Sequence, residues 1–176
     1  MTLSYQEILQ DSQWFYDQAE SAQKNSIIQK RLSIASILFS FMALESFINN
    51  MMSDFTILPS GILTPHEQGF LAERVVELAD SGGNAGKFEV TNRQRYQSLE
   101  NKIMFLVARF SRGKVDKGST LWQRFQKMKD IRDILTHPRK DTTKVPSPID
   151  AEEAIEVAKD IIQLVSQKVW GKKVQF

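Results

Sequence analysis

Arg132 and His137 have the residue types and the spacing for acid–base chemistry on a phosphate. Four residues separate them, near the end of the segment TLWQRFQKMKDIRDILTHP. An imidazole exchanges protons near neutral pH, and a guanidinium binds phosphate oxygens through two parallel hydrogen bonds. At about 100° per residue, Asp133 lies one turn before His137 on the same face of a predicted helix, within reach of the imidazole. The pattern places three polar groups at one helix end.

The position of His137 also has a purely structural explanation. A histidine before a proline at a helix C-terminus caps carbonyls and interacts favourably with the helix dipole without any catalysis. The expected buried stripe of this helix consists of Leu121, Phe125, Met128, Ile131 and Leu135. His137 points about 160° away from the centre of that stripe. We therefore expect an exposed histidine, with Arg132 at the flank of the stripe.

Charge is distributed unevenly along the chain, although the net charge is only +2. Residues 93–144 contain 14 Lys and Arg against 5 Asp and Glu, and the rest of the chain contains 9 against 16. A basic half favours a polyanion partner such as nucleic acid, because cations that neutralise phosphates release condensed counterions. The alternative is that these cations form a solvated face or pair with the acidic half.

Several kinds of chemistry are excluded by composition. The sequence has no Cys and two histidines, His66 and His137, so a disulfide, a thiolate nucleophile, an iron–sulfur cluster and a Cys-based zinc site are ruled out. The glycines at 82, 83 and 86 follow a predicted helix and lack the Lys and Ser/Thr of a P-loop, so they indicate a flexible connection. No G-x-S-x-G motif marks a serine nucleophile.

Four carboxylates lie near the start of the last predicted helix, namely Glu152, Glu153, Glu156 and Asp160. They suit the positive end of the helix dipole, and they have no histidine nearby to complete a metal site. We therefore expect no metal and no cofactor.

Capping boxes precede almost every predicted helix. In such a box, a Ser or Thr and a Glu or Gln three residues later satisfy two free amides at a helix start. The pairs are Ser4 with Glu7, Ser26 with Gln29, Thr64 with Glu67, Thr91 with Gln94 and Thr120 with Gln123, and Asp150 with Glu153 is a close variant. They predict helices over 4–24, 26–55, 65–80, 92–112, 120–137 and 150–170, and no strand.

The connections between these helices are too short to be domain linkers, so we expect one domain over residues 1–176. Six helices with short connections predict an all-α, antiparallel helical bundle. The longest apolar stretch, 32–48, is too short for a membrane span and contains four serines and Glu45, so we interpret it as the central buried helix. The first twenty residues show no secretory signal, which favours the cytoplasm and no membrane partner.

The motif RDILTHP at 132–138 resembles the signature of the HEPN superfamily, in which an Arg and a polar residue are followed by a His after four to six intervening residues. ALESFIN at 43–49 is similar to the corresponding segment of that family's second helix. Residues 98–110 are similar to the helix that precedes the catalytic one. The resemblance covers residues 27–137, and the Arg-His motif is its most specific part.

This resemblance implies an all-α domain that forms a homodimer in which the two motifs meet. Such domains are commonly metal-independent endoribonucleases of toxin–antitoxin or defence systems, with a cognate antitoxin protein as partner. By position, Arg132 and His137 would be catalytic. Asp133 takes a polar place often held by Asn, which leaves open whether its charge weakens phosphate binding. Some members are inactive RNA- or protein-binding or regulatory modules, which is the alternative function.

The residues themselves suit RNA cleavage. RNA carries its own nucleophile, the 2′-hydroxyl, so proton transfer and charge stabilisation at phosphorus suffice without a metal. His137 would transfer the proton, and Arg132 would bind the nonbridging oxygens as charge accumulates. Two histidines across a symmetric dimer would divide the roles of base and acid. The cations expected to hold the RNA backbone are Lys127, Lys129, Arg139 and Lys140.

Overall fold

The computed structural model describes residues 3–59, 61–111, 113–137 and 145–176. These residues are mostly helical, which confirms the helical character predicted from the sequence. The α-helices are α1 (Tyr5–Ser21), α2 (Ile27–Thr56), α3 (Pro65–Leu71), α4 (Leu99–Phe110), α5 (Thr120–Thr136) and α6 (Pro148–Trp170). Two strands, β1 (Arg74–Leu78) and β2 (Phe88–Gln94), and the short 3₁₀ helix η1 (Gly82–Asn84) lie between α3 and α4.

The chain divides into two compact units. The helical unit consists of residues 1–47 and 107–176, and the hairpin unit consists of residues 48–106. Because of these bounds, α2 and α4 each contribute residues to both units. The expectation of one domain over the whole chain, and of one bundle formed by all six helices, stays a prediction.

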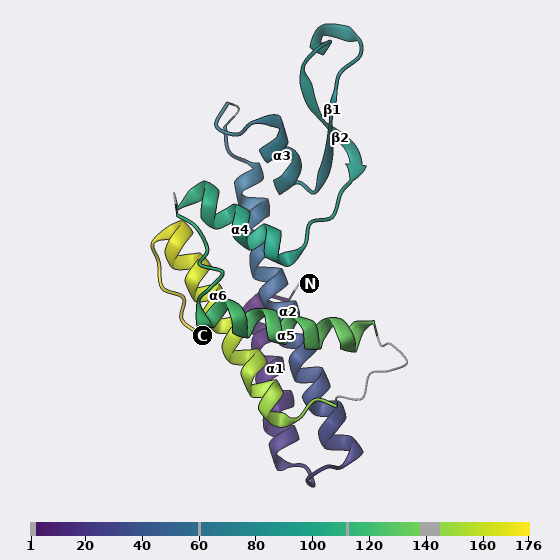
Figure 1. Cartoon of the computed structure of the whole chain (residues 1–176), viewed down its shortest axis with the longest axis vertical. Coiled ribbons are helices and arrows are strands. Elements are labelled where there is room, and N and C mark those ends of the chain that lie inside the picture. Colours follow the sequence, from purple (N-terminus) through teal and green to yellow (C-terminus); the bar gives the residue numbers. More distant parts are fainter. Residues whose placement is uncertain (1–2, 60, 112, 138–144) are drawn as a thin grey trace. The chain divides into compact units, whose positions relative to one another are not determined.

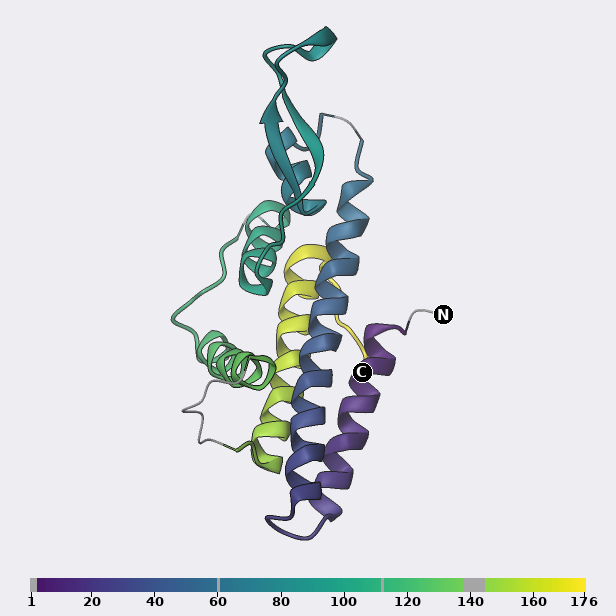
Figure 2. The ribbon, with the colours of Figure 1, turned by 90° about the vertical axis from the view of Figure 1, so that its right-hand side faces the viewer.

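In the helical unit, α1, the first part of α2 and α6 lie side by side, and α5 lies across them (Figures 1 and 2). Between α1 and α2 the contact is partly polar. The buried Ser12 hydroxyl donates to the Ser36 carbonyl at 2.8 Å and lies 2.7 Å from the Ser40 hydroxyl. Each buried hydroxyl therefore has a partner, as burial of polar groups requires. Ring contacts between Phe15 and Phe39, 5.0 Å apart, extend the same interface.

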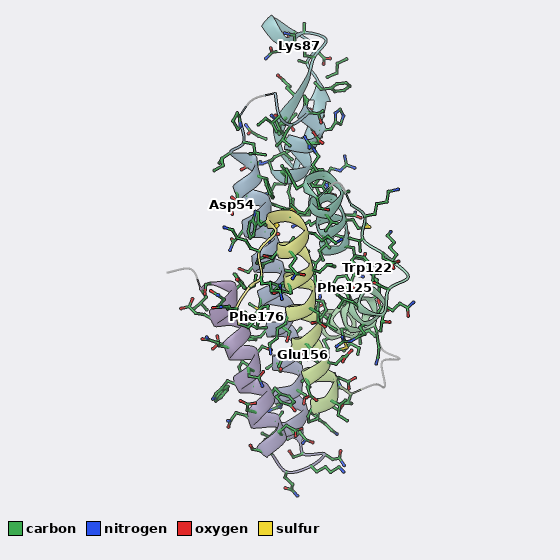
Figure 3. The ribbon with its side chains drawn as sticks, turned by 90° about the vertical axis from the view of Figure 1, so that its left-hand side faces the viewer. Asp54, Lys87, Trp122, Phe125, Glu156 and Phe176 are labelled. Atoms are coloured by element: carbon green, nitrogen blue, oxygen red, sulfur yellow. The ribbon has the colours of Figure 1, made fainter. Side chains whose placement is uncertain are left out.

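Apolar side chains of α2, α5 and α6 form the core of the helical unit. Phe41 and Phe125 are almost fully buried, with ring centroids 6.3 Å apart. Figure 3 labels Trp122 and Phe125 on α5, whose rings lie 5.1 Å apart. The buried face of α6 consists of Ala151, Ala154, Ile155, Val157, Ala158, Ile161, Ile162 and Val165. This packing holds α5 against α6.

The expected burial of α2 is met in part, and its central position in a bundle stays a prediction. Ile37, Phe41, Leu44 and Ile48 are buried, whereas Ile34 and Leu38 are only half-buried. By length and composition alone, α2 could cross a membrane, and half of its most apolar window is buried in the structure. The core helix of a soluble protein has the same properties, and two buried serines of α2, Ser36 and Ser40, contact Ser12 on α1.

The hairpin unit corrects the predicted absence of strands. Helix α3 ends at Leu71 instead of continuing to residue 80, and Glu73 follows with a left-handed φ of 51°. The chain then enters β1, which pairs with β2 in the antiparallel hairpin seen in Figure 1. Val76 pairs with Val90, and β-branched residues favour such a pleated, half-buried surface. The glycine-rich segment is confirmed as a connection, because it joins the two strands.

A glycine allows α3 to lie against the hairpin. A Cβ atom added to Gly69 would lie 2.3 Å from Cγ2 of Val76 and 3.1 Å from the carbonyl oxygen of Arg74. Since real Cβ atoms do not approach other atoms so closely, position 69 requires glycine. The helix and β1 are thereby brought close enough for Phe70 and neighbouring residues to line a common pocket.

The helix predicted over 92–112 starts later than expected, at Leu99. The Thr91 hydroxyl does not cap a helix, because it donates across the hairpin to the Val75 carbonyl at 3.0 Å. Ser98 takes the capping position instead, and its hydroxyl accepts the Asn101 amide at 3.2 Å. Residues 92–94, which the capping pattern assigned to a helix, therefore belong to strand β2.

The other predicted boxes are met to different degrees. The boxes of Ser4 with Glu7 and of Thr64 with Glu67 are confirmed. The Gln29 amide donates to the Ser26 hydroxyl, but the Gln29 side chain accepts from the Asn25 amide. Two caps lie earlier in the chain than predicted: Ser119 instead of Thr120, and Ser147 with Asp150 instead of Asp150 with Glu153.

Candidate functional site

Helix α5 carries the predicted catalytic residues Arg132 and Asp133, and the third, His137, is its C-cap residue. Ser119 caps its start, and its buried residues are Trp122, Phe125, Met128 and Ile131. The buried stripe therefore begins at Trp122, whereas Leu121 and Leu135 are only half-buried. Its last turn ends at Thr136, and the C-cap residue His137 has φ −130° and ψ 67°. The His137 amide donates to the Asp133 carbonyl at 2.9 Å.

His137 is exposed, as its angle from the buried stripe predicted. Its imidazole has no partner in the part of the chain that the structure describes. The carboxylate of Asp133 is engaged elsewhere, so the predicted contact between Asp133 and the imidazole is replaced by the backbone contact described above. The ring is therefore accessible to a ligand from solvent.

Arg132 is held on three sides. Its Nη2 atom donates to Oε1 of Glu45 on α2 at 2.9 Å. Its Nε atom lies 3.3 Å from Oδ1 of Asp133. Its guanidinium carbon lies 5.3 Å from the centre of the Phe41 ring, within range of a cation–π interaction. These contacts fix the plane of the guanidinium at the surface of the α2–α5 contact.

One part of the Arg132 side chain is incompletely satisfied. Its Nε atom is buried and has no hydrogen-bond partner among the described residues, although the Asp133 carboxylate is near. A guanidinium has five N–H donors, and within the described residues the hydrogen bond of this one comes from Nη2. Nη1 therefore keeps donors for an anionic ligand.

The residues expected to bind RNA differ in their surroundings. Lys127 is exposed and has no hydrogen bond or ion pair within the described residues. Nζ of Lys129 lies 3.4 Å from Oδ2 of Asp133, and its side chain is largely buried. Arg139 and Lys140 lie outside the described residues. Lys127 is thus the described cation of this set that is most accessible to a phosphate.

A second arginine of α5 explains part of the acidic cluster of α6. Arg124 binds Glu153 through Nε at 2.8 Å and Nη2 at 3.3 Å, and it binds Asp160 through Nη1 at 3.1 Å. The hydrogen bond from Arg124 lowers the pKa of the Glu153 carboxyl, and the charges of Arg124 and Lys127 act in the same direction. The bond to Glu153 likewise raises the pKa of Arg124. These carboxylates join α5 to α6.

No cluster of three or more His, Asp or Glu side chains that could hold a metal ion occurs among the described residues. Three acidic side chains of α6, those of Glu153, Glu156 and Asp160, have basic partners instead. Besides the Arg124 pairs, Glu156, which Figure 3 labels on α6, accepts from Lys159 at 3.2 Å. What the α5 terminus presents to a ligand is a guanidinium and an imidazole.

Sequence reasoning did not assign a role to Glu45, the partner of Arg132. A signal was nevertheless present, because Glu45 is the charged residue within the apolar segment 32–48. A charged side chain within an apolar helix is a candidate for an ion pair with a basic residue elsewhere in the chain.

The sequence matches no protein-family model, and no curated protein and no solved structure is significantly similar to it.

Proposed function

We propose that this protein is a metal-independent endoribonuclease of HEPN type, which acts as a homodimer with a composite site made of Arg132 and His137. The observation that carries the proposal is the geometry of the α5 terminus. An exposed imidazole follows, little more than one turn later, a guanidinium that Glu45 and Phe41 hold in place. A fixed anion binder and a free proton carrier, both at one helix end, are the groups that cleavage of a phosphodiester requires.

The reaction uses the nucleophile that RNA supplies. His137 of one subunit accepts the proton of a 2′-hydroxyl, whose oxygen attacks the adjacent phosphorus. The bond to the 5′-oxygen of the next nucleotide breaks, and that oxygen takes a proton from His137 of the partner subunit. The products are a 2′,3′-cyclic phosphate and a free 5′-hydroxyl. Each histidine performs one proton transfer, which explains why two copies are needed.

Arg132 stabilises the charge that accumulates on the nonbridging oxygens during this attack. Its contacts with Glu45 and Asp133 leave Nη1 to donate to phosphate. Because the guanidinium is already oriented, little reorganisation is needed when the transition state forms. Lys129 lies beside Asp133 and offsets its negative charge. Lys127, with Arg139 and Lys140, attracts the RNA backbone.

Exposed apolar residues around the site favour a second copy as the partner. Met42 on α2 precedes Glu45 by three residues, and Ile134 on α5 precedes His137 by three, so each lies near the site. Their exposed fractions are 50% and 39%. Burying these side chains across a twofold axis would bring the two Arg-His pairs together. The proposal includes a cytoplasmic location and a cognate antitoxin that masks the same face.

The contacts of Arg132 also favour a second, non-catalytic function. Arg132 has carboxylate partners on α2 and α5, and its ion pair with Glu45 serves to hold these two helices together. With Arg132 in that structural role, the protein would be a non-catalytic helical module that binds RNA or a partner protein. The exposed, unpaired Lys127 fits either function.

One variant separates the two functions. Purified protein is incubated with RNA in EDTA, and His137→Ala is compared with Asp130→Ala, which changes an exposed residue of the same helix. We expect cleavage to be lost in His137→Ala and retained in Asp130→Ala, with unchanged circular dichroism for both. Undiminished cleavage by His137→Ala would assign the activity to another site or a contaminant, and the module would then be the better explanation.

A further inference from the structure

The hairpin unit contains a pocket that the Arg-His site does not use. It has a volume of about 360 Å³ and lies where α3 meets the start of β1 and the chain that follows β2. Its lining consists of His66, Phe70, Arg74, Val76, Arg95 and Gln97. The volume is in the range of sites for small organic ligands.

Backbone features at the base of the hairpin bring the two arginines together. Glu73 adopts a left-handed φ of 51°, which is uncommon for a residue with a side chain. Its carbonyl accepts the Arg95 amide at 2.8 Å, and its carboxylate accepts the Gln97 amide at 2.8 Å. Lys102 completes the arrangement with Nζ 2.9 Å from the same carboxylate. Glu73 thereby fixes the chain just before Arg74 and at Arg95.

The strand pairing is irregular next to Arg74. Arg74 pairs with Gln94, and Val76 pairs with Val90, so β2 has two more residues than β1 in this interval. Such irregularities are frequent beside functional sites. Arg74 also donates from Nη1 to the Asn92 carbonyl, so its side chain is anchored across the hairpin.

The pocket is positively charged. Its lining has two arginines and one histidine but no carboxylate among the described residues. Nearby acids have other roles: Glu73 holds Lys102, and Glu67 caps its own helix at Thr64. Glu77 and Glu89 are opposite each other in the backbone pairing of the two strands, one position from the pair Val76 and Val90. Because side chains alternate along a strand, both carboxylates lie on the face of the hairpin away from Val76 and the pocket.

Arg95 is the cation of this pocket with unused donors. Its side chain is exposed and has no ion pair or hydrogen bond in the described part of the chain. By contrast, Arg93 lies two residues earlier and is paired with Glu77. A guanidinium that faces a pocket without an acidic partner is suited to bind a phosphate.

Planar rings lie beside these cations. His66 and Phe70 line the pocket, and Phe88 meets the His66 ring edge-on with centroids 4.7 Å apart. Phe70 is itself stacked on Phe105 with centroids 4.4 Å apart, which holds its ring in place. Aromatic rings next to arginines are the combination that binds a nucleobase and its phosphate together.

We propose that this pocket binds a nucleotide unit, with its phosphate at Arg74 and Arg95 and its base against His66 and Phe70. The same chemistry occurs in a free nucleotide and in a single-stranded RNA, and the experiment below separates these sources. The assignment does not depend on catalysis by Arg132 and His137, since the pocket is built from the hairpin unit alone.

The test measures binding to the full chain with a fluorescein-labelled 2′-O-methyl decauridylate, which lacks the 2′-hydroxyl nucleophile and cannot be cleaved by the proposed reaction. AMP and ribose 5-phosphate serve as competitors and as direct ligands in calorimetry. The variants are Arg95→Ala and its matched control Arg93→Ala, which removes an equal charge two residues away. Circular dichroism verifies that both variants fold.

We expect Arg95→Ala to weaken binding about tenfold, the loss of a charge-assisted contact, and Arg93→Ala to change it less than about twofold. Binding of AMP that depends on Arg95 identifies a free nucleotide as the ligand, whereas binding of the oligonucleotide alone identifies an RNA strand. Equal losses in both variants would overturn the proposal in favour of general electrostatic attraction, as would binding of neither probe. Ribose 5-phosphate binding as tightly as AMP would overturn the role of the rings.

Discussion

Glu45 accepts a hydrogen bond from Arg132 at 2.9 Å, although 87 positions separate the two residues in the chain. This bond joins α2 to α5, and Arg132 precedes the exposed His137 by five positions. The Arg132 side chain is 22% exposed and that of Glu45 is 41% exposed, so solvent screens the pair only in part. The same contact therefore contributes to stability and orients the Arg132 guanidinium.

A double-mutant cycle measures the stability contribution of this contact. We expect Glu45→Gln and Arg132→Met to be coupled by about 0.5–1 kcal/mol in the free energy of unfolding, the range for a partly exposed ion pair. Urea denaturation of the wild type, both single variants and the double variant gives the coupling. A coupling near zero would show that the bond does little to hold α2 against α5.

The Phe41 ring lies 5.3 Å from the guanidinium carbon of the same arginine, and it is buried in the core. We expect Phe41→Ala to lower the free energy of unfolding by about 3–5 kcal/mol, the usual cost of removing a core aromatic ring. Exposed Trp14 on α1 offers a comparison, because Trp14→Ala removes a ring that is 55% exposed. Similar losses in the two variants, measured by urea denaturation, would contradict the central position of α2.

Stability at acid pH should depend on Glu153. The hydrogen bond from Arg124 lowers the pKa of Glu153 below its ordinary value of 4.5 in the folded protein. A lowered pKa means that the stabilisation is fully present above the unfolded value and is lost as the pH falls through the folded value. We therefore expect Glu153→Gln to reduce the free energy of unfolding most near pH 7, with a difference that shrinks below about pH 4.5.

The matched control for this prediction is Glu156→Gln, which changes a more exposed carboxylate of the same helix, paired with Lys159. Its effect on the free energy of unfolding should be smaller at neutral pH. Denaturation series between pH 3 and pH 7 compare the two variants with the wild type. A difference for Glu153→Gln that grows as the pH falls would reverse the expected sign and disprove the assignment.

Local sequence patterns predicted the helices better than the hairpin. A capping box depends on four consecutive positions, so the boxes at Ser4 and Thr64 could be found from the sequence. At Thr91 the same pattern misled, because the hydroxyl bonds to Val75, sixteen positions away. Where two hydroxyl residues are adjacent, as at Ser119 and Thr120, the pattern alone does not decide which one caps the helix.

The candidate site was predictable in its residue types but not in its contacts. Exposure of His137 follows from its angle on the helix, and the structure agrees. The pairing of Arg132 with Glu45 depends on how two distant helices pack, which no local pattern encodes. The pocket around Arg95 was not predicted from the sequence, because it depends on a β-hairpin and the sequence patterns predicted helices there.

Assembly through the Arg132 face is tested by placing a charge on it. We expect Ile134→Asp to convert a dimer to a monomer and to abolish cleavage, because a buried carboxylate without a partner disfavours association. Ile57→Asp is the control, since Ile57 is 83% exposed and lies in the hairpin unit. Light scattering at micromolar concentration gives the oligomeric state. A wild type that is strictly monomeric would leave one histidine for two proton transfers and would refute the composite site.

Binding and catalysis should respond differently to the loss of different cations. Replacing Lys127 or Lys129 with Ala should weaken RNA binding and lower its salt dependence by about one counterion, with turnover at saturation unchanged. Arg139 and Lys140 should behave in the same way. Arg132→Lys keeps the charge but loses the planar fork, so it should lower the cleavage rate far more than the RNA affinity. Rates at saturating RNA and binding isotherms at several salt concentrations provide both quantities.

Arg124→Lys is the matched control for Arg132→Lys, because both arginines lie on α5 and bind carboxylates of a neighbouring helix. Arg124 holds α5 against α6 and is not part of the proposed site, so its replacement should lower stability and leave the saturated rate unchanged. A rate loss confined to Arg132→Lys therefore reports on the transition state rather than on folding. If Arg132→Lys and Lys129→Ala weaken binding alike and leave the rate unchanged, Arg132 is one more phosphate contact, and the RNA-binding module becomes the better explanation.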